Sequence, residues 1–243
     1  MRRPTYLRYE VLRTFRNGRF LIFSLAFPLI LLLTIGGSNQ DAHLDGISFP
    51  LYYMVGMASY GSMVAVISSG ARIAAERQIG WTRQLHITPL PTSAYFRAKV
   101  LCGYLMALLS LAVLYAAGTL LGVRLSGTQW LTMTALILIG LIPFAVIGVL
   151  LGHVLGVDSM GPAMGGVTSL FALLGGAWGP LAASGVFLAI VKCLPSYWLV
   201  QSGKTALGHS GWPPAEAWIV LAVWTAATAR LAVYIYKRDT ARV

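Results

Sequence analysis

The chain has 243 residues, of which 57% are hydrophobic and 10% are charged, whereas an ordinary soluble domain carries about 25% charged residues. This composition excludes a soluble catalytic domain and predicts an all-α polytopic membrane protein, because a run of about 20 apolar residues crosses a bilayer as a helix. The net charge of +11 would suggest nucleic acid in a soluble protein, but in a membrane protein it orients the loops. No nucleic-acid partner is therefore expected.

Residues 1–19 hold six arginines and a single acid, Glu10. At about 100° per residue, Leu7, Val11 and Phe15 share one helical face, and the arginines lie opposite that face or at its margins. The pattern predicts an amphipathic helix that lies on the inner leaflet and is anchored by its arginines. A frayed basic tail that only orients the first span is the alternative, and both place the N-terminus in the cytoplasm.

The apolar runs predict one membrane domain over residues 1–243, with six spans. The spans are expected at residues 20–37, 51–73, 100–123, 131–155, 160–176 and 216–236. In the fourth span Gly148, Gly152 and Gly156 recur every four residues, and such a series of small residues predicts a face for close helix packing.

Residues 159–191 contain no charge; they are too many for one untilted span and too few for two spans with a polar connection. We therefore expect the fifth span to end near Gly176. Residues 177–195 would form a hairpin that enters the outer leaflet and returns, its backbone sheltered by protein. Two ordinary spans are the alternative, and residues 192–215 are expected to be an outer segment.

The loop charges divide unevenly under the six-span assignment. Fifteen basic residues and four acids fall on one side of the membrane, and three of each on the other. The positive-inside rule then places both termini in the cytoplasm, together with a polar island at residues 74–92.

Groups for chemistry are absent from the predicted spans. No ionisable residue lies deep in them, which argues against an ion-coupled carrier, and there is no H-E-x-x-H, no G-x-S-x-G and no carboxylate cluster for a metal. The triplet Gly203-Lys204-Thr205 resembles the end of a phosphate loop, but Trp198 stands where that loop needs its first glycine. We expect no catalytic or metal site and no nucleotide hydrolysis by this chain.

The polar island carries a recognisable pattern. Glu76, Arg77, Gly80, Leu85 and Pro89 fit E-R-x-x-G-x-x-x-x-L-x-x-x-P, which resembles the loop between the second and third spans in the ABC-2 family of ATP-binding-cassette transporter permeases. The resemblance extends over the chain: a basic interfacial helix, six spans, this loop, and an outer hairpin before the last span.

The resemblance implies partners as well as a fold. Two permease chains, identical or different, would pair in the membrane, and cytoplasmic ATPase subunits would dock beneath them and bind ATP and Mg. This chain would be non-catalytic and hold no cofactor. The localisation implied is the bacterial plasma membrane.

By resemblance, residues 74–85 would form the coupling helix that contacts the ATPase. Glu76 would lie near the N-terminus of this helix, where its charge would interact favourably with the helix dipole or with an arginine of the ATPase. Trp81 and Leu85, four residues apart, would form an apolar projection that fits a cleft. Where the family often has a further acid, this chain has Arg83 and Gln84, which suggests a partner surface of its own. The residues expected to couple are Glu76, Arg77, Gly80, Trp81, Arg83, Gln84, Leu85 and Pro89.

The family resemblance also places spans two and five against the other protomer. The candidates for lining the substrate path or the dimer interface are Tyr53, Met57, Tyr60, Phe171 and Leu174; ordinary packing is the alternative. Methionines and aromatic rings suit a bulky apolar cargo, so we expect export of a hydrophobic or amphipathic drug, antibiotic or lipid-like molecule. Within the family, the alternative is export of a polysaccharide or lipid-linked glycan. Outside the family, the alternatives are a membrane facilitator and a membrane-embedded enzyme.

Overall fold

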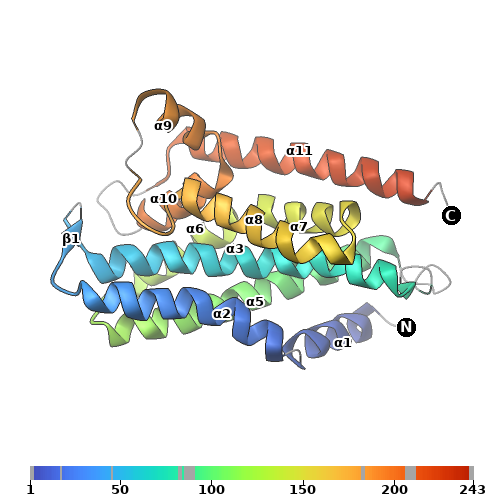
Figure 1. Ribbon diagram of the computed structural model, residues 1–243, viewed down its shortest axis with the longest axis horizontal. Helices are drawn as coiled ribbons and strands as arrows, with labels where there is room; N and C mark the ends of the chain where they lie inside the picture. The colour runs from blue at the N-terminus through green and yellow to red at the C-terminus, as the bar shows by residue number, and fades with distance from the viewer. Residues whose placement is uncertain are drawn as a thin grey trace.

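The computed structural model describes residues 3–16, 18–44, 46–81, 84, 91–181, 184–205 and 212–240. Most of its helices run along the long axis, and the first residues of α1 and the last of α11 lie at one end of the molecule (Figure 1). The elements are α1 Arg3–Arg16, α2 Gly18–Leu31, the π-helix η1 Leu32–Gly36, β1 His43–Leu44, β2 Ile47–Ser48, α3 Phe49–Gln78, α5 Thr92–Leu120, α6 Gly127–Gly140, α7 Ile142–Val154, α8 Val157–Gly175, α9 Gly185–Lys192, α10 Pro195–Thr205 and α11 Ala215–Thr240.

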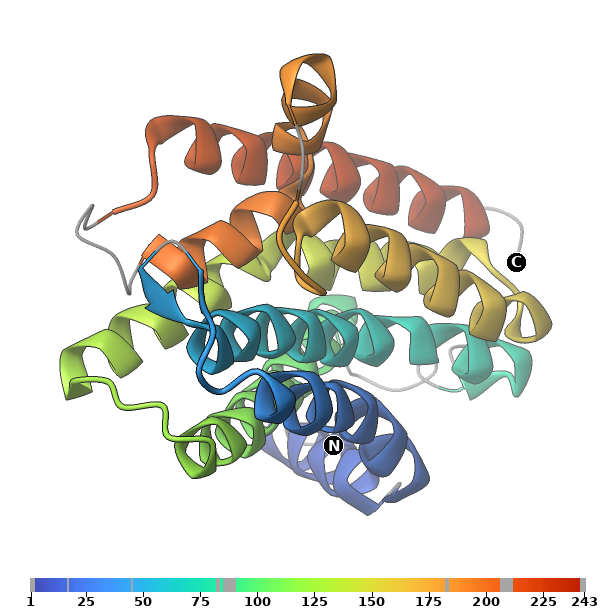
Figure 2. The same ribbon diagram turned by 60° about the vertical axis from the view of Figure 1, so that its left-hand side comes forward.

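The helix α3 forms the centre of the molecule. It lies between α2 and α5 on one side and α7 and α8 on the other (Figure 2). Of its most apolar 18-residue stretch, 89% is buried. Its side chains Tyr53, Met57 and Tyr60 belong to the main hydrophobic core. The predicted second span is therefore enclosed by helices of its own chain.

Close packing of α3 on α7 depends on glycines. A Cβ at Gly148 would lie 2.5 Å from the carbonyl oxygen of Ile67, and one at Gly152 would lie 2.5 Å from that of Gly70. A Cβ at Gly156 would meet nothing within 4 Å. The packing face predicted from the glycine spacing is confirmed for the first two positions and is wrong for the third, while Gly70 of α3 was missed.

Length and composition identify four helices that could cross a membrane within the described residues: α3, α5, the continuous stretch Gly127–Val154 and α11. The bent pair α9–α10 would make a fifth. The first predicted span is formed by α2 and the π-helix η1, which follows it directly. Among the residues whose side chains are described, its apolar helix Leu25–Gly36 is shorter than a full span. The membrane class is borne out, and the count of six spans is not confirmed by this criterion.

A bent pair of helices lies near the position predicted for the hairpin. Gly176 ends α8 in the left-handed conformation with φ of 70°, and α9 and α10 then meet at an angle of 88°. The polar-looking α10 is packed against α6 and α8 and buries Trp198 and Ser202. The bent pair covers Gly185–Thr205 and so overlaps both the hairpin predicted at residues 177–195 and the outer segment predicted at residues 192–215; its geometry fits a broken span or a re-entrant loop.

Two tryptophans stabilise this bend. The indole nitrogen of Trp198 donates to the carbonyl of Lys192 at 2.6 Å, and that of Trp224 donates to the carbonyl of Cys193 at 2.8 Å. The last carbonyls of a helix have no partner within the helix, and such groups are costly when unpaired in an apolar environment. These two donors allow the chain to turn sharply without leaving carbonyls unsatisfied.

We expect Trp198→Phe to destabilise the bend by about 1–3 kcal/mol, because it leaves the Lys192 carbonyl unpaired. Thermal unfolding of the detergent-purified protein measures the loss. Trp178→Phe is the matched control, since the Trp178 indole nitrogen has no hydrogen-bond partner among the described residues. Equal shifts in Tm for the two variants would contradict this account.

Candidate functional site

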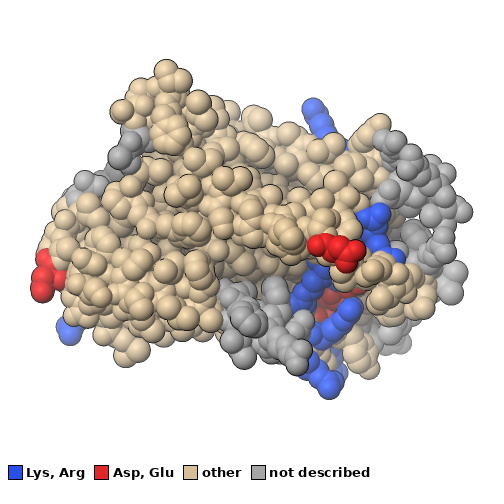
Figure 3. Space-filling view, in the orientation of Figure 1, with Lys and Arg blue, Asp and Glu red and all other residues tan. Residues whose placement is uncertain are grey.

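Charged side chains gather at the end of the molecule where α1, the last turns of α3 and the first turns of α5 meet (Figure 3). We call this the charged end. Three charged side chains are buried there, one from each helix: Glu10 is 5% exposed, and Glu76 and Lys99 are each 1% exposed. Charges are removed from water at this depth only when they are paired.

These residues form a carboxylate–lysine cluster made of Glu10, Arg13, Glu76, Tyr95 and Lys99. The Lys99 ammonium donates to a carboxylate oxygen of Glu10 and, at 2.5 Å, to Oε1 of Glu76. Arg13 donates to the same Glu76 oxygen at 3.0 Å, and the Tyr95 hydroxyl donates to Oε2 at 2.6 Å. Two anions are thus balanced by two cations, and both oxygens of Glu76 have donors.

Further contacts attach α1 to α3 and α5 around this cluster. Arg72 donates to the hydroxyl of Thr14 at 2.9 Å, and the hydroxyl of Ser69 donates to the Lys99 carbonyl at 2.8 Å. Burial, together with the negative charges of Glu10 and Glu76, raises the pKa of Tyr6 above its ordinary value, so its hydroxyl stays protonated. The three helices are joined by polar contacts as one unit.

The face of α1 that meets the protein differs from the one we expected. Its buried residues Tyr6, Glu10 and Thr14 are four apart and form one stripe. Leu7 and Val11, expected to face lipid with Phe15, are half-buried, and the Phe15 side chain lies outside the described residues. A polar stripe faces inward because Glu10 pairs with the buried Lys99.

The island does not form one coupling helix over residues 74–85. Its first part, through Gln78, is the end of α3, and Gly80 breaks the helix with φ of 73°, a conformation that costs glycine little. Helical geometry resumes beyond it, where the backbone nitrogen of Gln84 donates to the Gly80 carbonyl at 3.2 Å. The expected contacts Arg83, Leu85 and Pro89 lie outside the described residues.

The other predicted coupling residues mostly face inward. Glu76 lies in the last turn of α3 and not near a helix N-terminus, so the expected dipole interaction is wrong. Both its carboxylate oxygens are paired within the cluster, and its contact with an ATPase arginine stays a prediction. Arg77 donates to the carbonyl of His153 and, at 3.4 Å, to that of Gly152, which ties the end of α3 to the end of α7. The indole nitrogen of Trp81 is buried beside the hydroxyl of Tyr6.

Within the described part of the island, an exposed aliphatic residue was missed by sequence reasoning. Ile79 is 67% exposed, and Gln78 and Gln84 are exposed near it. An aliphatic side chain directly before a glycine in a polar loop was the available signal. Sequence reasoning also missed Lys99, Tyr95 and the pairing of Glu10.

The substrate-path candidates do not form one surface. Tyr53, Met57 and Tyr60 pack inside this chain, in line with the packing alternative. The ring of Phe171 lies 5.4 Å from that of Phe144 and 6.2 Å from that of Trp224, and Leu174 is half-buried.

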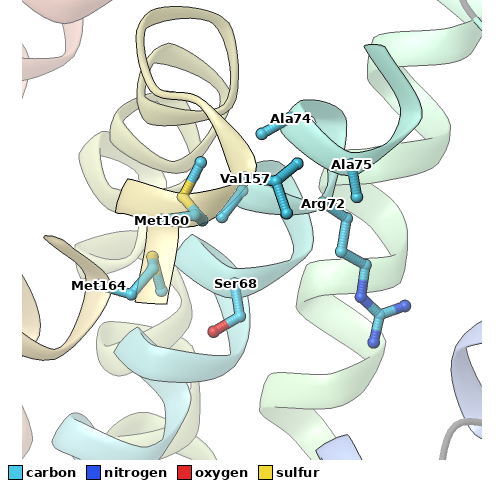
Figure 4. Close-up of a pocket in the computed structure, with 8 residues that line it drawn as sticks. Ser68, Arg72, Ala74, Ala75, Val157, Met160 and Met164 are labelled. Atoms are coloured by element: carbon cyan, nitrogen blue, oxygen red, sulfur yellow. The ribbon is translucent and has the colours of Figure 1, made fainter. Parts of the chain in front are cut away.

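A pocket of about 360 Å³ opens instead between α3 and α8, near the charged end. Val157 and Met160 at the start of α8 face the last turns of α3, while the guanidinium of Arg72 extends away from the methionines (Figure 4). Its lining is Ser68, Ala71, Arg72, Ala74, Ala75, Val157, Met160 and Met164. The described residues include no group of three or more His, Cys, Asp or Glu side chains placed to hold a metal ion.

Comparison with known proteins agrees with this arrangement of elements. The family model for the ABC-2 type transporter matches residues 5–205. The chain is also 26% identical over 235 residues to the Bacillus subtilis (strain 168) protein YvfS, which is named as a transport permease; the match covers 96% of each chain.

Proposed function

The chain belongs to the ABC-2 type transporter family, and from that premise we propose that it is the membrane-spanning permease subunit of an ATP-binding-cassette exporter. Separate cytoplasmic subunits bind ATP and Mg and hydrolyse the nucleotide, and a second permease chain completes the pathway. This chain then supplies the gate and the surface on which the ATPase acts, and no catalytic step of its own.

The proposed topology has six crossings, by α2 with η1, α3, α5, α6–α7, α8 and α11, while α9–α10 enters and returns on one side. Support comes from the described ends of α1 and α11, which lie at the same end of the molecule (Figure 1) and so require an even number of crossings. Because basic residues gather at that end (Figure 3), the positive-inside rule favours cytoplasmic termini in a bacterial plasma membrane.

The observation that carries the mechanism is the carboxylate–lysine cluster, which joins the beginning of the island, at Glu76, to α1 and α5. A movement of the ATPase against the exposed Ile79 is transmitted to the end of α3. There Glu76 is bound to α5 through Lys99 and to α1 through Arg13. Separating these helices would leave buried charges unpaired, at a cost of about 3–5 kcal/mol. The three helices therefore move together, and the 30-residue α3 conveys the motion along the membrane normal.

We expect Ile79→Asp to weaken association with the ATPase subunit at least about tenfold, because loss of an apolar hot spot from an interface costs about 2 kcal/mol or more and the aspartate adds a charge that must be desolvated. Co-purification of the ATPase with the tagged permease measures the effect. Val154→Asp is the matched control, since Val154 is another exposed aliphatic residue, at 55% exposure, and lies at the end of α7, which Arg77 ties to the end of α3. If Ile79→Asp associated with the ATPase as the wild type does, or if both variants lost association equally, docking of the ATPase at Ile79 would be contradicted.

The proposed substrate is hydrophobic or amphipathic. Support comes from the pocket between α3 and α8, whose methionines and alanines offer an adaptable apolar wall. A polysaccharide or lipid-linked glycan would instead need hydroxyl and amide partners along its path, and Ser68 and Arg72 are the polar members of this lining.

A further inference from the structure

The helix α1 has an outward face that differs in kind from its buried stripe. Among its described side chains, Arg8, Leu12 and Arg16 are exposed and four residues apart, so they form one row along the helix. Tyr9, 61% exposed, lies beside this row. The row points away from α3 and α5, because Glu10 and its stripe occupy the opposite side.

The outward face carries one sign of charge together with exposed apolar groups. Arg8 and Arg16 are exposed, while the single acid of the helix, Glu10, is 5% exposed and paired with Lys99. Leu12 is 47% exposed between its two arginines. Water would solvate the guanidinium groups but not the leucine and the tyrosine ring.

Charge decides which occupant fits this face. A second copy of α1 would bring like charges together and be repelled. Phosphodiester head groups are anionic, accept bidentate hydrogen bonds from arginine, and lie directly above the acyl region into which Leu12 and Tyr9 could insert. A lipid surface therefore matches both the cations and the apolar side chains of the row.

We propose that the row Arg8–Leu12–Arg16 on α1 binds anionic phospholipid head groups in the leaflet at the charged end of the molecule. The bound lipid does not contact the carboxylate–lysine cluster; it holds the opposite side of the same helix. Glu10 of α1 is paired with Lys99 of α5, and Lys99 is also paired with Glu76 of α3. The bound lipid therefore fixes the depth of the charged end in the membrane. The site needs no ATPase and goes beyond the transport function proposed above.

Native mass spectrometry of the full-length detergent-purified chain tests the site by titration with dioleoylphosphatidylglycerol and, separately, with dioleoylphosphatidylcholine. An arginine near an anionic lipid surface is worth about fivefold in affinity, so Arg8→Gln with Arg16→Gln should weaken phosphatidylglycerol binding on the order of 30-fold. Binding of phosphatidylcholine should not change. The matched control Arg124→Gln removes an exposed arginine between α5 and α6, at the opposite end (Figure 1), and should retain wild-type affinity.

Two further measurements complete the test. Leu12→Gln should also weaken phosphatidylglycerol binding, and inorganic phosphate should not compete, because the site requires an acyl chain as well as an anion. Unchanged affinity of the double variant, or an equal loss in Arg124→Gln, would overturn the proposal. Loss of ATPase co-purification in the double variant with unchanged lipid binding would assign the row to the ATPase instead, and would leave the exporter function standing.

Discussion

Lys99→Met should destabilise the protein by about 3–5 kcal/mol, because it leaves two buried carboxylates without their common cation. Glu10 and Glu76 come from different helices and are 5% and 1% exposed, so neither can recover its charge solvation without separating α1 from α3. For a chain of this size the loss corresponds to a fall in Tm on the order of 10 °C. Thermal unfolding of the detergent-purified protein measures it.

A neutralised variant distinguishes charge from packing. When Lys99→Met is combined with Glu10→Gln and Glu76→Gln, no unpaired carboxylate remains, and most of the lost stability should return. Wild-type stability of Lys99→Met alone would mean that the cluster does not hold the three helices together. A triple variant as unstable as the single one would assign the effect to the shape of the lysine side chain.

The variant with the restored stability also tests coupling. It should fold and still bind the ATPase subunit through Ile79, but substrate-stimulated ATP hydrolysis should fall, because α1 and α5 are no longer tied to the end of α3 by charge. Reconstitution of the permease with its ATPase in liposomes measures this activity. Full stimulation in the neutralised variant would contradict the role proposed for the cluster.

Gly70→Leu should prevent the native packing of α3 on α7 and abolish accumulation of folded protein. Even Gly70→Ala should cost about 1–3 kcal/mol, because its Cβ would lie 2.3 Å from the carbonyl carbon of Gly148, a backbone atom that cannot rotate away. Yield of monodisperse protein and Tm measure the two variants.

Gly165→Ala provides the matched control. Gly165 lies within α8, and a Cβ there would meet nothing within 4 Å. Alanine should therefore be neutral, or stabilising by about 0.5–1 kcal/mol, through helix propensity. If Gly70→Ala were as stable as Gly165→Ala, the close approach of α3 and α7 would not be needed for the fold.

Local sequence patterns predicted several parts of the architecture. The glycine spacing in the fourth span predicted the positions at which α7 approaches α3, because close backbone approach needs the absence of a side chain. It could not identify Gly70 as the partner, since that depends on the register between two helices. The helix α10 was not predicted for a related reason: Ser202 resembles a loop residue in the sequence, but it is buried in a helix that packs against α6 and α8.

The sequence by itself determined that this chain is a helical membrane protein of the ABC-2 type and that a polar island follows its second predicted span. Transfer of apolar runs into lipid and the composition of a loop are local properties, so a single sequence carries them. Only the tertiary structure decided which side chains of the island's described part are buried and which are exposed. Glu76 lies 23 residues from Lys99 along the chain, and Glu10 lies 89 residues from it. Because buried charges must be paired, that meeting turns Glu76 inward, while Ile79, three residues further on, is exposed.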